Sequence, residues 1–443
     1  MGLLEPTDIT QVLAPSSADR TAAQFTATSS AEPRTICILA LSLIADDPRA
    51  RRQAEAFHHA GWKVVAVGLP GAKSPPPEWP ILTRHDPPTV PARSIIERLP
   101  RQLLHALQYR LRLLAVRVRP EMAQQIYWIY WSWSQNVLDI YECARRVNAA
   151  VWLANDWNML PIAARLAREN GGVYSYDTHE LAIEEYAENP KWRLFQRSMV
   201  SAIERRFIGD AVVISAVSSG IAERLDKFYQ LSRPTLTIRN TPSFEEIPFR
   251  PTRRDRIQLL YHGIVVPNRG IEAAIDSVPL WRPEFTLTIR GPENPAFSPA
   301  LRERIANLGL GHRVRLVPPV PMTALVREAA AFDVGISFLP GNSRNNEFAL
   351  PNKFFEYVMA GLALCASDRP EMARLIQQYD LGVTIAAVEP KAIAVAINAL
   401  DPDRIDRFKR NALAAARELC WERESERLVG AYSAALAHAP RNL

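Results

Sequence analysis

Short apolar runs alternate with segments of helical periodicity through the first half of the chain. The apolar runs are TICILALSLI, WKVVAVG, AAVWLAND, GVYSYDTHE and DAVVISAVS. Apolar residues recur at helical spacing in the neighbouring segments 47–60, 161–170 and 218–229. A strand, a helix and a second strand within about 35 residues predict a parallel βαβ unit. We therefore expect a parallel sheet covered by helices.

The same alternation resumes near residue 255 and continues toward the end of the chain. Its apolar runs are IQLLYHG, FTLTIRG, VRLVPPV, FDVGISFLP and LALCAS, and its helical patterns are RGIEAAIDSVPLW, NKFFEYVMAG, an Ala-rich stretch from 390 and 404–437. Pro242, Pro248 and Pro251 interrupt regular structure between the two blocks. The pattern predicts an α/β protein with two Rossmann-like, doubly wound domains facing a cleft, where ligands of this architecture bind.

These breaks also predict the domain boundaries. Residues 1–33 are rich in Ala, Ser, Thr and Pro without periodicity, so we expect a flexible tail there. We expect the first domain at 34–245 and the second at 246–415. Residues 416–443 are expected to form a C-terminal helical segment.

Composition excludes several classes of protein. The 443 residues are 48% hydrophobic and 23% charged, which is ordinary for a globular protein. The four cysteines (Cys37, Cys143, Cys365 and Cys420) form no CxxC pair, which disfavours a disulfide framework or a zinc ribbon and fits a reducing cytoplasm. The longest uncharged apolar runs have about half the length of a membrane span. The N-terminus lacks a basic-then-apolar signal pattern, so we expect a cytoplasmic protein.

The net charge of +6 is concentrated in one segment. Residues 91–120 hold the arginines at 93, 98, 101, 110, 112, 117 and 119 and a single acid, Glu97. The rest of the chain is therefore balanced, which predicts a local anionic partner and disfavours nucleic-acid binding.

Residues 101–119 have the periodicity of an amphipathic helix. One stripe holds Arg101, His105, Gln108, Arg112 and Arg119, and another holds Leu103, Leu104, Leu107, Leu111, Leu114 and Val118, flanked by Arg110 and Arg117. With Trp128, Trp131 and Trp133 close behind, the pattern is typical of a helix at the surface of an anionic membrane. The alternative is an ordinary helix packed on the first sheet with its arginines in water, and such packing is the commoner arrangement. For the aromatic run 127–133 we expect a place in the core.

The segment 345–361 (NNEFALPNKFFEYVMAG) combines features of an anion site. Pro351 suits the first position of a helix and Asn352 suits a cap. Lys353 then lies in the first turn beside free backbone N–H groups, where the helix dipole favours a negative charge. Glu356, one turn further, suits hydrogen bonding to ribose hydroxyls. The alternative is a capped helix whose Lys353 and Glu356 are merely solvated.

Two further segments follow predicted strands. After the strand that ends at Tyr261, Gly263 permits a tight turn with close ligand approach, and Arg269 can neutralise a phosphate. Asp177, His179 and Glu180 follow another strand, so we place them at the cleft side of the first domain. His179 suits a contact with a substrate hydroxyl or leaving group, although a histidine satisfied by the backbone is the commoner case.

A set of phrases occurs in the order found in one known family. They are YDTHE, DAVVISAVSSGIAERL, TIRNTPSF, YHGIVVPNRGIEAAI, FTLTIRGPE, VRLVPPVPMTALV, FDVGISFLP and ALPNKFFEYVMAG. Together they make the chain resemble glycosyltransferase family 4 (glycosyltransferase group 1), most specifically from Tyr176 to Gly361. The resemblance implies the GT-B fold and retaining, metal-independent transfer of a sugar from a nucleotide-sugar donor, without a cofactor. It places the nucleotide in the second domain, most of the acceptor in the first, and the C-terminal helix back on the first domain.

The resemblance also implies roles for individual residues. Arg269 resembles the basic residue of the family's KG loop, which binds the diphosphate. Glu356 resembles the second glutamate of the E-x7-E motif, the ribose ligand, and His179 resembles the histidine near the transferring sugar. Gly291 and the strand end reaching Val320 resemble the parts that surround nucleotide and base.

Two positions depart from the family pattern. The first glutamate of E-x7-E falls on Phe348, so we expect Glu347 to substitute for it, or Asn345 and Asn346 to contact the sugar. An arginine often found after the KG-loop glycine is Ile264 here, and we expect Lys353 to supply that charge. The candidate catalytic residues are His179, Arg269, Lys353 and Glu347, and the candidate donor-binding residues are Gly263, Arg269, Gly291, Val320, Asn346, Asn352, Lys353 and Glu356.

The favoured function is a glycosyltransferase acting on a glycan or lipid-linked acceptor in cell-surface polysaccharide assembly. A non-catalytic GT-B partner subunit is the first alternative, suggested by Phe348 and Ile264. A nucleotide-sugar 2-epimerase on the same fold is the second, although such enzymes carry more acids and histidines in the cleft. A dehydrogenase is disfavoured, because no GxGxxG follows the first strand.

Overall fold

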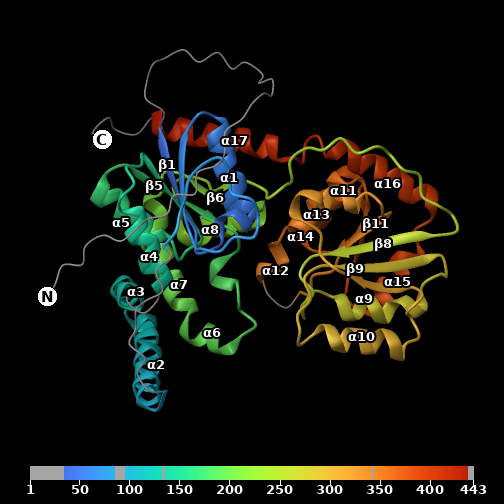
Figure 1. The fold of residues 1–443 in the computed structure, drawn as a ribbon, viewed down its shortest axis with the longest axis horizontal. Helices are drawn as coiled ribbons and strands as arrows, with labels where there is room; N and C mark the ends of the chain where they lie inside the picture. The colour runs from blue at the N-terminus through green and yellow to red at the C-terminus, as the bar shows by residue number, and fades with distance from the viewer. Residues whose placement is uncertain (1–33, 85–94, 132–134, 342–343, 438–443) are drawn as a thin grey trace. The chain divides into compact units, whose positions relative to one another are not determined.

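A computed structural model describes residues 34–84, 95–131, 135–341 and 344–437. The tail expected at 1–33 lies outside this range. The chain divides into two compact units (Figure 1). Unit 1 comprises Met1–Ala216, Ala222–Leu236 and Glu426–Leu443, and unit 2 comprises Val217–Ile221 and Thr237–Ser425.

Unit 1 is built on a seven-stranded sheet with the order β3-β2-β1-β4-β5-β6-β7, parallel from β3 to β6. The strands are β1 (Thr35–Leu39), β2 (Lys63–Val67), β3 (Ile81–Leu82), β4 (Val151–Asn155), β5 (Val173–Thr178), β6 (Ile214–Ala216) and β7 (Leu236–Thr237). The helices are α1 (Pro48–His59), α2 (Ile95–Val118), α3 (Ala123–Trp131), α4 (Gln135–Ala144), α5 (Leu160–Asn170), α6 (Pro190–Phe195), α7 (Arg197–Phe207) and α8 (Ser219–Tyr229), whose first turn belongs to unit 2. Every residue of β4 is buried, as expected for a parallel strand covered on both faces.

Unit 2 is built on a six-stranded, wholly parallel sheet with the order β10-β9-β8-β11-β12-β13. The strands are β8 (Ile257–His262), β9 (Phe285–Arg290), β10 (Val314–Val317), β11 (Val334–Ser337), β12 (Ala363–Ser367) and β13 (Gly382–Ile385). The helices are α9 (Ile271–Ser277), α10 (Ser298–Asn307), α11 (Leu325–Ala329), α12 (Arg344–Phe348), α13 (Asn352–Met359), α14 (Pro370–Tyr379), α15 (Pro390–Asn398) and α16 (Pro402–Ala415). The predicted α/β class, with two parallel sheets, is confirmed.

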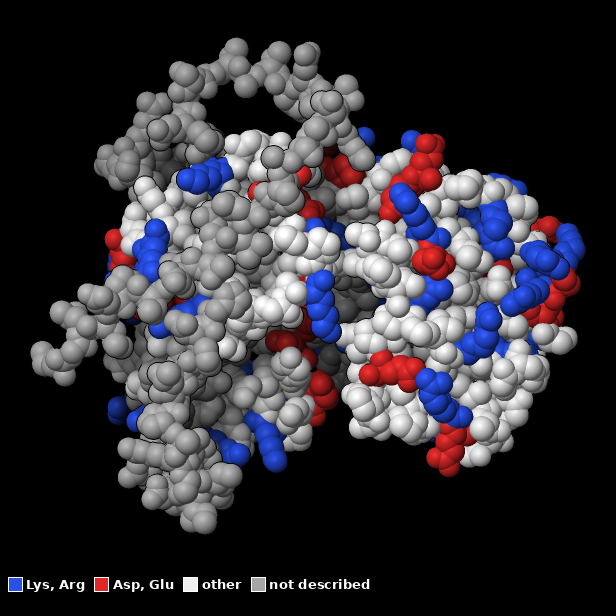
Figure 2. Space-filling model, viewed as in Figure 1, with Lys and Arg blue, Asp and Glu red and all other residues white. Residues whose placement is uncertain are grey.

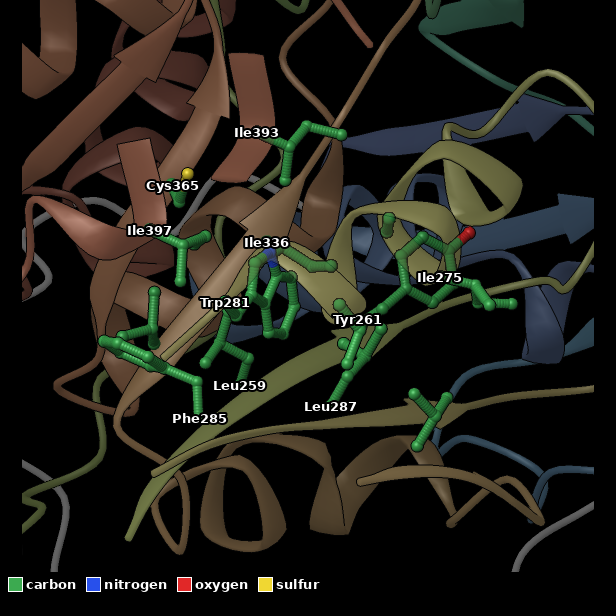
Figure 3. Close-up of a cluster of buried hydrophobic side chains, with 14 of the residues drawn as sticks. Leu259, Tyr261, Ile275, Trp281, Phe285, Leu287, Ile336, Cys365, Ile393 and Ile397 are labelled. Atoms are coloured by element: carbon green, nitrogen blue, oxygen red, sulfur yellow. The ribbon is translucent and has the colours of Figure 1, made fainter. Parts of the chain in front are cut away.

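Strand β8 lies inside its sheet and sends alternate side chains into two cores. Leu259 and Tyr261 enter a cluster with α9 and α15 that includes Ile275 and Ile393 (Figure 3). Leu260 enters a second cluster, on the face covered by α13. Because side chains alternate along a strand, the β8 residues of even number are directed toward α13, which becomes important at the strand's end.

The segment expected to be helical from 404 to 437 is two helices. Helix α16 ends at Ala415, and α17 (Trp421–Ala437) begins after a turn in which the Trp421 amide donates to the Pro242 carbonyl at 2.8 Å. The later part of α17 belongs to unit 1, where the Tyr432 hydroxyl bonds Ser175 at 2.8 Å and its ring packs against Phe57. None of the helices in the described ranges has the length and apolar character needed to cross a membrane.

Helix α2 leaves three of the four described residues of its apolar stripe exposed. Its main contacts are with α3, α6 and α7, and it presents Leu113 and Val116 to the protein, each 1% exposed. Leu107, Leu111 and Val118, on the opposite side, are 54%, 57% and 82% exposed. Packing on the first sheet through the leucine stripe, one of the two alternatives above, is therefore wrong for these residues.

Several side chains of the basic and aromatic segments lie outside the described part, namely those of Arg101, His105, Trp131 and Trp133. In the aromatic run, Tyr127 is buried and its hydroxyl donates to the Asn158 carbonyl at 2.5 Å. The core position expected for the run is therefore confirmed for Tyr127, whereas Ile129 is 40% exposed.

Candidate functional site

Two glycines at neighbouring strand ends bring the backbones of β8 and β9 into direct contact. Gly263 follows β8 with φ +135°, and Gly291 follows β9 with φ +157°. The register pairs His262 with Arg290, so the two glycines are the next positions along the sheet. A Cβ on Gly291 would lie only 1.8 Å from the Gly263 carbonyl oxygen. Only glycine fits there, and the carboxyl edge of the sheet consequently has a bare backbone surface.

Lys353 extends from the first turn of α13 toward this glycine turn. Its Nζ lies 3.6 Å from the centre of the Tyr261 ring, and a Cβ on Gly263 would lie 3.3 Å from that Nζ. Burial, reinforced by the positive charge of Arg269, lowers the pKa of Lys353 to about 7, against the opposing effect of Glu356. Lysine therefore changes charge here in the physiological range, and an anion beside it would favour the protonated form.

Arg269 is exposed in the loop between β8 and α9. Gly270, with φ +71°, follows it and caps α9. The charge of Arg269 acts on both Lys353 and Tyr261, so the two cations lie near one site. Two cations and a helix N-terminus at the end of a parallel sheet form an arrangement suited to a diphosphate.

Glu356 lies one turn further along α13 and is 9% exposed. Its Oε2 atom is 2.7 Å from Nε2 of His262, a side chain that is 2% exposed. The His262 amide donates to the hydroxyl of Tyr357 at 2.9 Å. The carboxylate is thus held beside the cations by the end of β8.

The N-terminus of α13 differs from expectation by one residue. The helix begins at Asn352, and Pro351 is the cap residue, whose carbonyl accepts from the Phe354 amide at 2.9 Å. Asn352 therefore does not cap the helix. Its side-chain oxygen instead accepts from Asn240 at 2.9 Å.

The residues preceding α13 form the short helix α12. Phe348 packs against Gly220, where a Cβ would lie 2.2 Å from its ring, and its carbonyl accepts from Ser218 at 2.8 Å. Asn346 donates to the Pro340 carbonyl at 3.4 Å, and Glu347 is partly exposed in the same helix. The sugar contacts of Asn346 and Glu347 stay predictions.

Val320 lies beyond the end of its strand. Strand β10 ends at Val317, whose carbonyl accepts from Gly291 at 3.4 Å, and Val320 is partly exposed in the following loop. The structure therefore connects Gly291 with this strand end.

His179 belongs to unit 1, directly after β5. Its Nε2 atom lies 3.0 Å from the side-chain oxygen of Asn155 and 3.5 Å from Asp177, and its Nδ1 lies 3.4 Å from Asp156. Burial lowers the pKa of His179, but the carboxylates of Asp156 and Asp177 outweigh it and raise the pKa to about 9.

Asp177 beside it is buried in a second charge pair. The Arg49 guanidinium donates to both carboxylate oxygens, at 2.7 and 2.6 Å. Although burial opposes this, Arg49 holds the pKa of Asp177 far below its ordinary value. In the described ranges, no group of three or more His, Cys, Asp or Glu side chains is arranged to hold a metal ion.

Two residues of the site escaped the sequence analysis. His262 and Tyr261 lie in the apolar run IQLLYHG, which predicts a strand and no binding role. The alternation of β8 was a signal, since His262 is a polar residue at a position directed to a buried face.

Comparison with solved structures shows which proteins share this fold. Sucrose-phosphate synthase of Thermosynechococcus elongatus superposes with a TM-score of 0.64 at 15% identity, over 92% of this chain and all of that one. HepE of Anabaena, in a structure titled as a complex with UDP-glucose, has a TM-score of 0.61 at 14% identity, over 90% of this chain and 99% of that one. The chain has the two-domain α/β fold of GT-B glycosyltransferases.

Sequence comparison adds a family match over one third of the chain. Residues 256–402 match the family "Glycosyl transferases group 1". A protein named D-inositol 3-phosphate glycosyltransferase from Acidothermus cellulolyticus is 27% identical over 260 residues, which are 53% of this chain and 57% of that protein. One of the same name from Nocardia farcinica is 31% identical over 139 residues, 31% of this chain and 30% of that protein. The matches thus span about half or less of these relatives, and they confirm the predicted resemblance to glycosyltransferase group 1.

Proposed function

We propose that this protein is a retaining glycosyltransferase that takes its sugar from a nucleotide-sugar donor bound at the carboxyl edge of the unit 2 sheet. The observation that carries the proposal is the cluster of Lys353, Arg269 and Glu356 around the glycine turn. Arg269 and Lys353 are assigned to the diphosphate and Glu356 to the ribose. The match to glycosyl transferases group 1 covers all three residues. The structures of HepE in complex with UDP and with UDP-glucose have the same fold.

The proposed chemistry needs stabilisation of a leaving diphosphate. The bond between the anomeric carbon and the diphosphate oxygen breaks, the electron pair leaves with that oxygen, and the acceptor oxygen bonds to the same face of the sugar. The leaving phosphate takes the acceptor's proton. Fixed cations and helix N–H groups stabilise the developing charge. Arg269, protonated Lys353 and the N-terminus of α13 supply this without a metal, and we assign His179 to the transferring sugar.

A binding and transfer series tests this function. The purified protein is melted with UDP, GDP and ADP and their common sugar conjugates, without metal, because a ligand of the folded state raises the melting temperature. We expect one base to give the shift. Transfer from the matching sugar conjugate to a lipid-linked acceptor should then yield a product with retained anomeric configuration. No shift with any nucleotide would contradict the donor site.

Phe348 stands where the family has the first glutamate of the E-x7-E motif. This replacement favours a second candidate function, that of a non-catalytic GT-B subunit. Phe348 is packed against the first turn of α8 and offers no polar atom to a sugar. Such a subunit would bind the nucleotide without turnover. An assay for free nucleoside diphosphate, run with and without acceptor extracts, distinguishes the two candidates. A transferase releases the diphosphate, whereas a non-catalytic subunit releases none.

The exposed face of α2 suits a lipid-linked acceptor at a membrane, for instance in cell-surface glycan assembly. Leu107, Leu111 and Val118 lie within about 40° of each other around the helix axis. Arg110 and Arg117 on one side, and Arg112 and Arg119 on the other, lie about 80–120° away. An apolar face edged by cations fits an anionic bilayer, each arginine near the surface adding about 1 kcal/mol. We propose peripheral binding to the cytoplasmic membrane face.

Flotation with phosphatidylglycerol-containing vesicles at low salt tests the membrane contact. The protein should float, and Leu107→Ser/Leu111→Ser should stay at the bottom of the gradient. The matched control is Leu308→Ser/Val395→Ser, which changes two apolar residues of unit 2 that are 42% and 72% exposed. Equal flotation of both double variants, or none of the wild type, would contradict the proposal.

A further inference from the structure

The last residues of β8 contact the two charged residues of α13 that the proposed function uses. Tyr261 lies under the ammonium of Lys353, at 3.6 Å from ring centre to Nζ. His262, on the other face of the strand, lies beside Glu356 with 2.7 Å between Nε2 and Oε2. The strand end therefore fixes where both side chains can lie.

In the described part of the chain, the ring nitrogens of His262 are buried without well-aligned hydrogen bonds. It is 2% exposed, and neither ring nitrogen has an aligned hydrogen-bond partner among the residues the structure describes. Its ring lies over Tyr357, with 4.6 Å between ring centres and 32° between planes. A buried polar group without an aligned partner is costly, so this arrangement calls for a purpose beyond packing. The contact with Glu356 is a candidate for that purpose. Hydrogen bonds used in binding and catalysis are often misaligned until a ligand is present, so the pair can align when a nucleotide binds.

We infer that His262 is a positioning residue for Glu356, and that together they set the preference of the site for a ribose over a deoxyribose nucleotide. This inference rests on the proposed donor site. A carboxylate on a helix can rotate, and a fixed carboxylate accepts hydrogen bonds from a ribose diol at a lower cost in side-chain entropy. The 2.7 Å contact with the His262 ring, which itself lies over Tyr357, restricts where that oxygen of Glu356 can lie. The hydroxyls of the ribose diol are then the groups whose contribution depends on His262, and the 2′-hydroxyl is the one that a deoxynucleotide lacks.

A purely structural role for His262 makes a different prediction. Removing a buried ring that only packs would lower stability and weaken every nucleotide to the same extent. Removing a positioning residue weakens the ribonucleotide selectively. The ratio of the two affinities, rather than either affinity alone, distinguishes these roles.

The experiment measures the dissociation constants of UDP and 2′-deoxy-UDP, with the GDP and ADP pairs run in parallel. The variants are His262→Phe, which keeps a ring over Tyr357 without a nitrogen, and His262→Gln, whose amide nitrogen can reach Glu356. His312→Phe, an exposed histidine of the same unit, is the control. Melting temperatures establish that each variant is folded, and His262→Asn, too short to reach Glu356, replaces the Phe variant if that one is unfolded.

We expect the wild type to prefer the ribonucleotide about tenfold, as one hydrogen bond to a charged group allows. His262→Phe should reduce this preference toward one, with a smaller loss of deoxynucleotide affinity because only the 3′-hydroxyl is left to depend on Glu356, and His262→Gln should restore most of the preference. An unchanged preference in His262→Phe, or an equal loss for both nucleotides, would overturn the inference while leaving the donor site standing. Failure of the wild type to bind any of the nucleotides would overturn both.

Discussion

The charged clusters at the carboxyl ends of the two sheets differ in how their charges are balanced. In unit 1, Asp177 is paired with Arg49, and His179 lies among carboxylates that raise its pKa to about 9. In unit 2, Arg269 and Lys353 repel one another, and burial lowers the pKa of Lys353 to about 7. The first cluster is neutralised by the protein itself, whereas the second gains most from an added anion. This difference favours unit 2 as the place where a diphosphate binds.

On the face seen in Figure 2, the surface of unit 2 carries basic and acidic side chains interspersed. Several of these are exposed ion pairs, such as Arg254 with Asp403 and Arg253 with Asp255. In each of these pairs the cation is already partnered by a carboxylate. The local arrangement at Lys353, and not the net charge of the unit, distinguishes the candidate site.

The largest expected effect is on the unit 2 cations. Lys353→Met and Arg269→Ala should each lower the transfer rate on the order of 10²-fold or more, because each removes a charge that stabilises the leaving diphosphate. Initial rates at saturating donor measure this. Lys391→Met and Arg256→Ala, which alter exposed cations elsewhere in unit 2, are the controls. Wild-type rates in both site variants would refute the assignment.

The next effect is on the stability of unit 1. Arg49→Met should lower the free energy of unfolding by about 3–5 kcal/mol, because it removes both hydrogen bonds of the guanidinium to the buried Asp177 and leaves only the more distant His179 to balance its charge. Arg49→Met/Asp177→Asn should lose less, since no unpaired charge remains. Urea unfolding measures both, with Arg253→Met, from an exposed pair, expected within about 0.5 kcal/mol of wild type. A double variant as unstable as the single one would argue against the buried pair.

A smaller effect concerns the pH dependence of stability, which has opposite signs in the two clusters. The raised pKa of His179 contributes stability below about pH 6.5 that is lost as the pH rises to about 9. The lowered pKa of Lys353 destabilises the fold fully below about pH 7, and this cost disappears as the pH rises to 10.5. Lys353→Met should therefore be more stable than wild type at pH 7, with the gain shrinking toward pH 10.5. His179→Asn should remove the loss between pH 6.5 and 9.

Urea titrations at intervals of half a pH unit distinguish these contributions. If the free energy of unfolding has the same pH dependence in Lys353→Met and the wild type, Lys353 is not desolvated in the free protein. The unit 2 cluster would then not differ from the unit 1 cluster in the way described above.

Much of this arrangement was predictable because it depends on local pattern. Continuous apolar runs predicted the strands, and the sequence around Lys353 and Glu356 predicted a helix N-terminus with a cation in its first turn. The break between α16 and α17 was not predicted, since helical periodicity on both sides hides a turn held by a contact with Pro242.

Other features depend on residues far apart in the chain. His262 and Glu356 are 94 positions apart in the numbering, and their contact requires the packing of β8 against α13. The contact of Gly263 with Gly291 depends on the register of β8 with β9. The periodicity of 101–119 predicted an apolar stripe, but the same pattern arises whether that stripe faces protein or solvent.

The number of protons taken up when the nucleotide binds shows whether its diphosphate lies beside Lys353. Calorimetric titration with UDP, GDP and ADP at pH 8, in two buffers of different ionisation enthalpy, gives that number. A diphosphate beside Lys353 should raise the pKa of this lysine, so we expect uptake of nearly one proton per nucleotide bound, at most about one. Lys353→Met should take up none. Tight binding by the wild type without proton uptake would contradict the claim that the nucleotide's diphosphate binds beside this lysine.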